Sequence, residues 1–192
     1  MFSGIVEELG EIKEISRRGN ITRITIKVGK IIEDSKTGDS IAVNGTCLTV
    51  VENSRGNLVF EAIPATFNST NLKDLRISGK VNLERSLKIG DRLSGHFVTG
   101  HVDCVGLIRK KSFVNNNLGF EIAIPDEFTK FILPKGSVSV DGISLTIMKK
   151  QSSVFWVYVI PHTLKSTTLG FKVPSDKVNI EFDILSKKAA AN

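Results

Sequence analysis

The segment IAVNGTCLTV at residues 41–50 occurs a second time, with substitutions, as VSVDGISLTI at residues 138–147. The same shift of 97 residues matches IPATFNSTNL at 63–72 to IPHTLKSTTL at 160–169, and VNLE at 81–84 to VNIE at 178–181. A shift of 96 residues places Gly4 and Val6 on Gly100 and Val102. Because the matching blocks keep their order, the chain is a tandem duplication of one domain.

A length of 192 residues accommodates two domains, each near the common size of roughly 100 residues. We place the first domain at residues 1–95 and the second at 96–183, with the join near GDRLSG at 90–95. The remaining residues, 184–192, form a short C-terminal tail that can begin a helix.

Strand patterns dominate both halves. Residues 21–28 (ITRITIKV) and 120–124 (FEIAI) alternate in polarity, and residues 154–160 (VFWVYVI) are β-branched and aromatic. Turn signals such as RGN at 18–20 and SRGN at 54–57 separate these runs. The pattern predicts an all-β fold of two tandem six-stranded antiparallel Greek-key barrels. Short helices are expected near residues 31–35, 66–72, 126–131 and 163–169, besides the one that can begin in the tail.

Composition argues against several classes of protein. No apolar run approaches the roughly twenty residues of a membrane helix, and the N-terminus lacks a signal-peptide pattern, so we expect a cytoplasmic protein. The net charge of +6 is spread along the chain, which disfavours nucleic-acid binding. His101 lies an odd number of residues from both His96 and Cys104, so in an extended strand it would face the side opposite to theirs. No metal site is therefore expected. Cys47 and Cys104 are expected to be free thiols.

Positions that both halves share indicate a task common to both, namely a ligand pocket in each half. The shared positions are Gly4 and Gly100, Leu48-Thr49 and Leu145-Thr146, and the IPxT motifs at 63–66 and 160–163. Thr66 and Thr163 can contact a ligand, cap the short helices that follow, or do both.

The halves differ at four aligned pairs whose side chains differ in chemical reactivity: Cys47 and Ser144, Ile5 and His101, Ser86 and Asp183, and Asn44 and Asp141. Each candidate also has a plain structural interpretation, since a thiol is often a small buried residue and a histidine or a strand-end carboxylate is often structural or exposed. From the residues alone, we predict two related pockets with unequal reactive groups.

Four segments resemble the signature segments of riboflavin synthase of the α-subunit type: MFSGIVE at 1–7, NGTCLT at 44–49, SGHFVTGHVD at 94–103 and DGISLT at 141–146. The match runs from residue 1 to about residue 186, beyond which the family usually continues into a longer helix. The resemblance implies transfer of a four-carbon unit between two molecules of 6,7-dimethyl-8-ribityllumazine. The products would be riboflavin and 5-amino-6-ribitylaminouracil, formed without a cofactor or metal.

The resemblance also implies partners. In the family each barrel binds one lumazine, and the reacting pair meets between the N-terminal barrel of one subunit and the C-terminal barrel of another in a homotrimer. Lumazine synthase would be a further protein partner. No nucleic acid and no membrane is expected to take part.

By resemblance, the catalytic residues would be Cys47, His101, Ser144 and Asp183. His101 would be the base or proton relay, Cys47 would assist or position the nucleophilic step, and Ser144 and Asp183 would move protons or hold the attacking water. Whether a side chain or a water attacks stays open.

Substrate binding would fall on the matching segments of each half. In the first barrel these are Gly4, Ile5, Val6, Cys47, Leu48, Thr49, Glu61, Ala62, Ile63, Pro64, Ala65 and Thr66. In the second they are Gly100, His101, Val102, Ser144, Leu145, Thr146, Tyr158, Val159, Ile160, Pro161, His162 and Thr163. Lys135 matches a family lysine that reaches a ligand across the subunit boundary.

Two other functions suit tandem barrels. A non-catalytic lumazine or flavin antenna protein is expected to lose the reactive residues of the second half, so the presence of His101, Ser144 and Asp183 favours the enzyme. A tandem oligonucleotide-binding protein should expose stacking aromatics among basic residues. Trp156 and Tyr158 lie instead in one hydrophobic strand.

Overall fold

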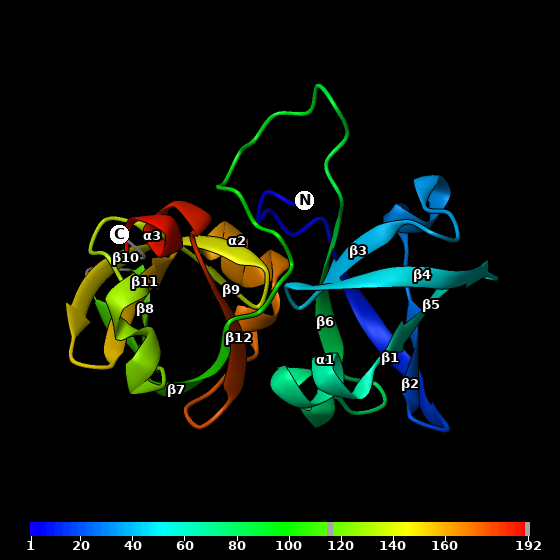
Figure 1. Ribbon diagram of the computed structural model, residues 1–192, viewed down its shortest axis with the longest axis horizontal. Helices are drawn as coiled ribbons and strands as arrows, with labels where there is room; N and C mark the ends of the chain where they lie inside the picture. The colour runs from blue at the N-terminus through cyan, green and yellow to red at the C-terminus, as the bar shows by residue number, and fades with distance from the viewer. Residues whose placement is uncertain (115–116, 191–192) are drawn as a thin grey trace.

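The computed structural model describes residues 1–114 and 117–190 and consists of two closed antiparallel barrels side by side (Figure 1). The first barrel has strand order β1-β2-β5-β4-β3-β6 and the second β10-β11-β8-β7-β12-β9, which is the same topology six strands later. The predicted all-β tandem barrel is therefore confirmed. The boundaries that we placed at residues 95 and 183 stay predictions, and residues 191–192 of the tail lie outside the described part.

The strands of the first barrel are β1 (Glu8–Arg18), β2 (Ile21–Lys27), β3 (Ser40–Val43), β4 (Thr46–Ser54), β5 (Asn57–Ala62) and β6 (Lys80–Arg85). Those of the second are β7 (Cys104–Val114), β8 (Asn117–Ala123), β9 (Ser137–Val140), β10 (Ile143–Gln151), β11 (Val154–Val159) and β12 (Lys177–Phe182). The helices are short: η1 (Lys30–Asp34), α1 (Pro64–Ser69), η2 (Asn71–Asp74), η3 (Asp126–Phe131), α2 (Pro161–Ser166), η4 (Thr168–Gly170) and α3 (Ile184–Ala189). Among the described residues, no helix has the length and apolar character needed to cross a membrane.

Each barrel encloses its own apolar core because alternate residues of every strand point inward. In β5, Leu58 and Phe60 are fully buried, while Glu61, which follows Phe60, faces outward. The same alternation in β11 buries Phe155 and Val157 in the second core. Burial of such large apolar side chains contributes about 1.5–3 kcal/mol each.

The helix-capping role considered for Thr66 and Thr163 is wrong. α1 begins after Ile63 and α2 after Ile160, each with a proline at the start of the helix and no side-chain cap. A proline suits this position because the first amides of a helix have no intrahelical acceptor. The carbonyls of Thr66 and Thr163 accept bonds from Thr70 Oγ1 (2.8 Å) and Thr167 Oγ1 (2.6 Å) instead.

The N-terminal segment of each half crosses to the other barrel. Phe2 and Val98 pair as an isolated antiparallel bridge where the two segments meet. Beyond it, the Ser144 amide of the second barrel donates to the Gly4 carbonyl (2.7 Å), and the Cys47 amide of the first barrel donates to the Gly100 carbonyl (2.9 Å). Residues 1–6 and 96–102, which we call the two arms, thus lie between the barrels, and each crosses far enough to bond the other half's barrel at Gly4 or Gly100.

Two tight turns meet back to back between the barrels. Gly45 and Gly142 have φ angles of +75° and +79°. A Cβ on Gly45 would lie 2.6 Å from the amide nitrogen of Gly142, and a Cβ on Gly142 would lie 2.8 Å from that of Gly45. Glycine is therefore required here both by conformation and by space.

Two equivalent asparagines, Asn82 in β6 and Asn179 in β12, surround this contact with hydrogen bonds. Asn82 Nδ2 donates to the Asp141 carbonyl (2.8 Å), and its Oδ1 accepts from the Thr168 amide (2.8 Å). Asn179 Nδ2 donates to the Asn44 carbonyl (2.8 Å), and its Oδ1 accepts from the Asn71 amide (2.7 Å). Because both side chains are buried and satisfied across the interface, they select one relative orientation of the barrels.

The twofold pattern breaks at Asp141, the counterpart of Asn44. Its Oδ1 accepts from Asn71 Nδ2 and from the Asn179 amide, both at 2.7 Å. Its Oδ2 has no hydrogen-bond donor among the described residues and lies 3.6 Å from Lys172 Nζ. Complete burial raises the pKa of Asp141, and the charge of Lys172 opposes that rise. The interface between the barrels is thus only approximately symmetric.

Replacement of Gly45 by alanine tests the back-to-back contact. We expect Gly45→Ala to lower the free energy of unfolding by about 2–4 kcal/mol, because left-handed strain adds to overpacking against Gly142. Gly56→Ala is the matched control, since Gly56 has φ +80° but a Cβ added there would meet no atom of the described residues within 4 Å. That control should lose only about 1 kcal/mol from strain. Equal losses in urea unfolding of the two variants would contradict the close contact.

Candidate functional site

The outer face of β4 and β5 gathers the predicted residues of the first barrel. Leu48 and Val50 enter the core, so Cys47 and Thr49 point outward. The antiparallel register sets Val50 opposite Phe60, which places Thr49 beside Glu61. The second arm adjoins this face because Gly100 accepts from the Cys47 amide. We call this face, made of residues 47–49, 61–66 and 100–102, site A.

The outer face of β10 and β11 repeats this arrangement in the second barrel. Ile147 lies opposite Val157 in the core, which places Thr146 beside Tyr158 on the outside. The first arm adjoins this face because Gly4 accepts from the Ser144 amide. We call this face, made of residues 144–146, 158–163 and 4–6, site B.

The sequence-based grouping of the pockets is wrong in one respect. We expected Gly4, Ile5 and Val6 to join the first barrel's pocket, and Gly100, His101 and Val102 to join the second barrel's. The crossing of the arms reverses both assignments, and Val6 packs against the core of the second barrel. Self-comparison shows which residues are equivalent, but it cannot show which copy of the barrel they contact.

The other predicted binding residues divide by the side to which they point. Leu48, Ala62 and Val159 are buried, and Leu145 packs against the second core, so their side chains are not available to a ligand on the outer face. The N-cap residues and first residues of α1 and α2 are exposed, namely Ile63, Pro64, Ala65, Ile160, Pro161 and His162. Thr66 and Thr163 lie half-buried inside the two helices.

Lys135 lies in the turn before β9 (Ser137–Val140). Its amide donates to the Ile147 carbonyl (2.7 Å), its φ angle is +71°, and its side chain is exposed. Its predicted role needs a ligand from a second subunit, and that role stays a prediction.

His96 lies beside the candidate residues of site B, although sequence reasoning did not select it. Its Nδ1 lies 2.7 Å from Ser144 Oγ, and Asp183 lies near enough to act on its charge. Burial lowers the pKa of His96 below its usual value and outweighs the opposing effect of Asp183. A neutral imidazole beside a hydroxyl can accept or donate a proton according to its tautomer. The structure thus brings Ser144, Asp183 and a histidine that was not predicted together at site B.

The remaining two reactive candidates lie at site A. His101 follows Gly100 on the second arm; its backbone amide donates to Thr99 Oγ1 (3.2 Å), and its side chain is exposed. Cys47 is a free, half-buried thiol beside that arm. Cys104, by contrast, is buried, which raises the pKa of its thiol to about 12 and makes it unreactive. Among the described residues, no group of three or more histidine, cysteine and acidic side chains could hold a metal ion.

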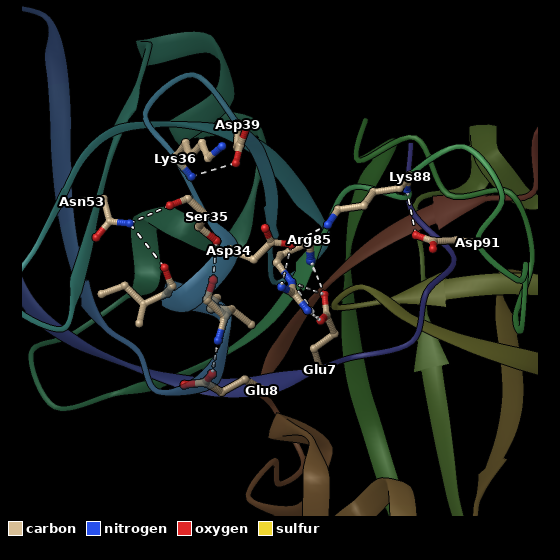
Figure 2. A network of polar contacts seen from close by, with 12 residues as sticks. Glu7, Glu8, Asp34, Ser35, Lys36, Asp39, Asn53, Arg85, Lys88 and Asp91 are labelled. Carbon is tan, nitrogen blue, oxygen red and sulfur yellow. Dashed lines mark hydrogen bonds and ion pairs between the residues drawn. The ribbon is translucent and has the colours of Figure 1, made fainter.

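Two cavities lie beside these faces rather than on them. One, of about 530 Å³, lies between the first barrel, the first arm and the linker at 86–95, and it borders site B only at Ile5. Its wall is an ion-pair network in which Arg85 bridges Glu7 and Asp34, and Lys88 pairs with Asp34 (Figure 2). A second cavity, of about 460 Å³, lies between η2, η4 and the loops that follow them. Ion pairs as exposed as those that line the first cavity contribute little to stability.

The influence of Asp183 on His96 can be measured directly. We expect Asp183→Asn to lower the pKa of His96 further, because the carboxylate's negative charge favours the imidazolium form and its removal takes that support away. NMR titration of the imidazole protons would report the change. Asp176→Asn, in the loop before β12, is the matched control and should leave the His96 titration unchanged. Identical His96 titrations in all three proteins would contradict the proximity of Asp183.

Comparisons with known proteins agree with this geometry. A family model described as "Lumazine binding domain" matches residues 3–86 and again residues 99–183, once on each barrel. Riboflavin synthase of Bacillus subtilis (strain 168) is 41% identical over 187 residues, which cover 97% of this chain and 87% of that protein. Riboflavin synthase of Mycobacterium tuberculosis (strain ATCC 25618 / H37Rv) is 40% identical over 191 residues, which cover 97% and 95%.

A solved structure shares the architecture. LumP complexed with riboflavin is similar with a TM-score of 0.88 and 30% sequence identity, covering 95% of this chain and 99% of that one. The tandem family match and the extent of the riboflavin synthase similarity lead to one conclusion. The chain belongs to the riboflavin synthase family of tandem lumazine-binding barrels.

Proposed function

We propose that the chain is a riboflavin synthase, a transferase that uses two molecules of 6,7-dimethyl-8-ribityllumazine. One lumazine gives up a four-carbon unit and leaves as 5-amino-6-ribitylaminouracil, while the other gains that unit and becomes riboflavin. The observation that carries the proposal is a pair of equivalent faces with unequal reactive groups. One substrate used twice needs two similar sites, and the donor and acceptor roles need different chemistry.

Site B has the groups for proton transfer at close range. Ser144 Oγ and His96 Nδ1 are 2.7 Å apart, and burial keeps the pKa of His96 low, so its ring is neutral near pH 7 and can accept a proton. Asp183 can stabilise the imidazolium that results. We propose that this group holds the attacking water or relays protons during ring opening and closure.

Site A offers a thiol and an exposed imidazole. We propose that His101 removes a proton from the acidic C7 methyl group of a lumazine, and that Cys47 assists or positions the nucleophilic step. The backbone at residues 48, 62 and 63 is suited to hold the pyrimidinedione edge. The equivalent backbone of site B lies at residues 145, 159 and 160.

Both sites are open faces that need a cover. Ile63 and Ile160 are each 58% exposed, and Ile5 is 45% exposed. A lumazine resting on such a face has one side of its ring against protein and the other side uncovered. A second lumazine held by another subunit would cover it, and opposed stacking turns a bimolecular condensation into a positioned one. We therefore propose a homotrimer with site A of one subunit facing site B of the next.

The similarity to LumP keeps a non-catalytic lumazine-binding or flavin-binding role as the second candidate. The grouping of Ser144, His96 and Asp183 at site B favours the enzyme, because binding alone needs no proton relay. An association with lumazine synthase stays a prediction.

Turnover by the purified chain is the direct test. We expect the lumazine alone, without added metal or cofactor, to be converted into equal amounts of riboflavin and the pyrimidine, followed by absorbance. If the site forms between subunits, dilution below the association range should lower the activity per chain. Activity per chain that is independent of concentration would contradict the intersubunit site. Tight binding without turnover would support the non-catalytic role.

Replacement of His101, the imidazole of site A, distinguishes a role in substrate binding from a role in catalysis. We expect His101→Ala to bind lumazine nearly as well as the wild type but to lose about 10²–10⁴-fold in kcat, because general-base catalysis is removed. His162→Ala is the comparison variant and should lose less, since Ala65 already occupies the equivalent place in site A. Unchanged turnover in His101→Ala would exclude His101 from the mechanism.

A further inference from the structure

Two buried glutamates occupy equivalent places near the ends of β6 and β12. Glu84 is 5% exposed and Glu181 is 3% exposed, and the two are 97 residues apart, as in the repeat. A carboxylate at this depth costs free energy unless donors surround it. Neither side chain forms an ion pair with a described residue, so both depend on neutral donors.

The donors come from the two arms. Glu84 Oε1 accepts from the amide and the hydroxyl of Ser3, both at 2.7 Å, and its Oε2 accepts from the Gly4 amide at 3.0 Å. Glu181 Oε1 accepts from the amide and the hydroxyl of Thr99, both at 2.6 Å, and its Oε2 accepts from the Gly100 amide at 2.9 Å. Each carboxylate therefore accepts hydrogen bonds from one hydroxyl and from two successive backbone amides of the arm that belongs to its own half.

The residue held by each carboxylate touches the reactive side chain of the other barrel. The Gly4 carbonyl accepts from the Ser144 amide at 2.7 Å, and the Gly100 carbonyl accepts from the Cys47 amide at 2.9 Å. A Cβ on Gly4 would lie 2.7 Å from Ser144 Cβ, and a Cβ on Gly100 would lie 2.5 Å from Cys47 Cβ. A single glycine residue, bound through its amide on one side and its carbonyl on the other, thus links each glutamate to a reactive residue.

We propose that Glu84 and Glu181 are positioning residues, each of which sets the reactive side chain of the opposite barrel. Glu84 in the first barrel holds Gly4 against Ser144 of site B. Glu181 in the second barrel holds Gly100, and with it the neighbouring His101, against Cys47 of site A. The inference rests on the proposed function, because it assumes that these two faces are the lumazine sites.

A carboxylate is the group that this task requires. Each glutamate accepts three hydrogen bonds, and bonds to a charged acceptor are shorter and stronger than neutral ones. Glutamine has nearly the same volume but replaces one acceptor oxygen with an NH₂ group, which would face an N–H or O–H donor. Glu→Gln variants therefore release part of the arm while leaving the packing of the barrel intact.

The test uses Cys47 as a reporter of site A in the full chain. We expect Glu181→Gln to change the iodoacetamide alkylation rate of Cys47 by about threefold or more and to weaken its protection by lumazine, since loosening the arm alters the thiol's exposure. Glu84→Gln should leave the alkylation of Cys47 at the wild-type rate. In a Cys47→Ser, Ser144→Cys background, the two variants should exchange effects. Each should lower kcat by about tenfold in the wild-type background.

Controls separate positioning from a general loss of structure. Glu7→Gln alters an exposed carboxylate next to the first arm that pairs with Arg85 rather than with the arm, and it should leave both reporters unchanged. Cys104 should stay unmodified in every variant if the second barrel remains folded. Should a glutamine variant fail to fold, Ser3→Ala and Thr99→Val remove only the hydroxyl hydrogen bond to each glutamate. They should change the alkylation rate at the same site as the corresponding glutamine variant, but by a smaller factor.

Several outcomes would overturn the inference. Equal effects of Glu84→Gln and Glu181→Gln on Cys47 would indicate general loosening, and no effect of either would remove the glutamates from the sites. A wild-type chain without turnover would contradict the proposed function, whereas the alkylation pattern would still decide whether each glutamate acts on the opposite barrel.

Discussion

The contact between Gly45 and Gly142 is the constraint on which the rest of the molecule depends. Two backbones meet there without side chains between them, so the barrels can approach only where both turns are glycine and both have positive φ angles. Asn82 and Asn179 then satisfy the buried carbonyl groups of Asp141 and Asn44 beside the contact. A buried interface of this polar kind tolerates little rotation, because any shift leaves groups unpaired.

The same turns lead directly into two candidate catalytic residues. Cys47 lies two residues after Gly45, and Ser144 lies two residues after Gly142. Each of these residues is then fixed a second time, through its backbone amide, by the arm that crosses from the other half. The central contact and the crossing arms therefore act on the same short segments, and each site is assembled from both halves of the chain.

Much of the fold could be predicted, because the duplication is visible when the sequence is compared with itself and the strand alternation is visible within short segments. The alternation in residues 21–28 and 120–124 places the side chains correctly in the two cores. The crossing of the arms could not be predicted, because a repeat is equally compatible with an arm that contacts its own barrel or the other one.

His96 was missed because, at a shift of 96 residues, its partner would precede residue 1, so comparison of the halves cannot reach it. Thr66 and Thr163 were considered as caps although the prolines at 64 and 161 begin the helices two residues earlier.

The linker at residues 86–95 follows β6 and leads into the second arm, and Figure 1 shows it as a loop that projects from the body of the chain. Its length is short enough to hold the second arm at a high effective concentration beside the first barrel. Exchange of arms inside one chain is therefore favoured over exchange between chains, which is the common route to domain-swapped dimers. Covalent duplication thus turns what would otherwise be a concentration-dependent swap into a fixed property of the monomer.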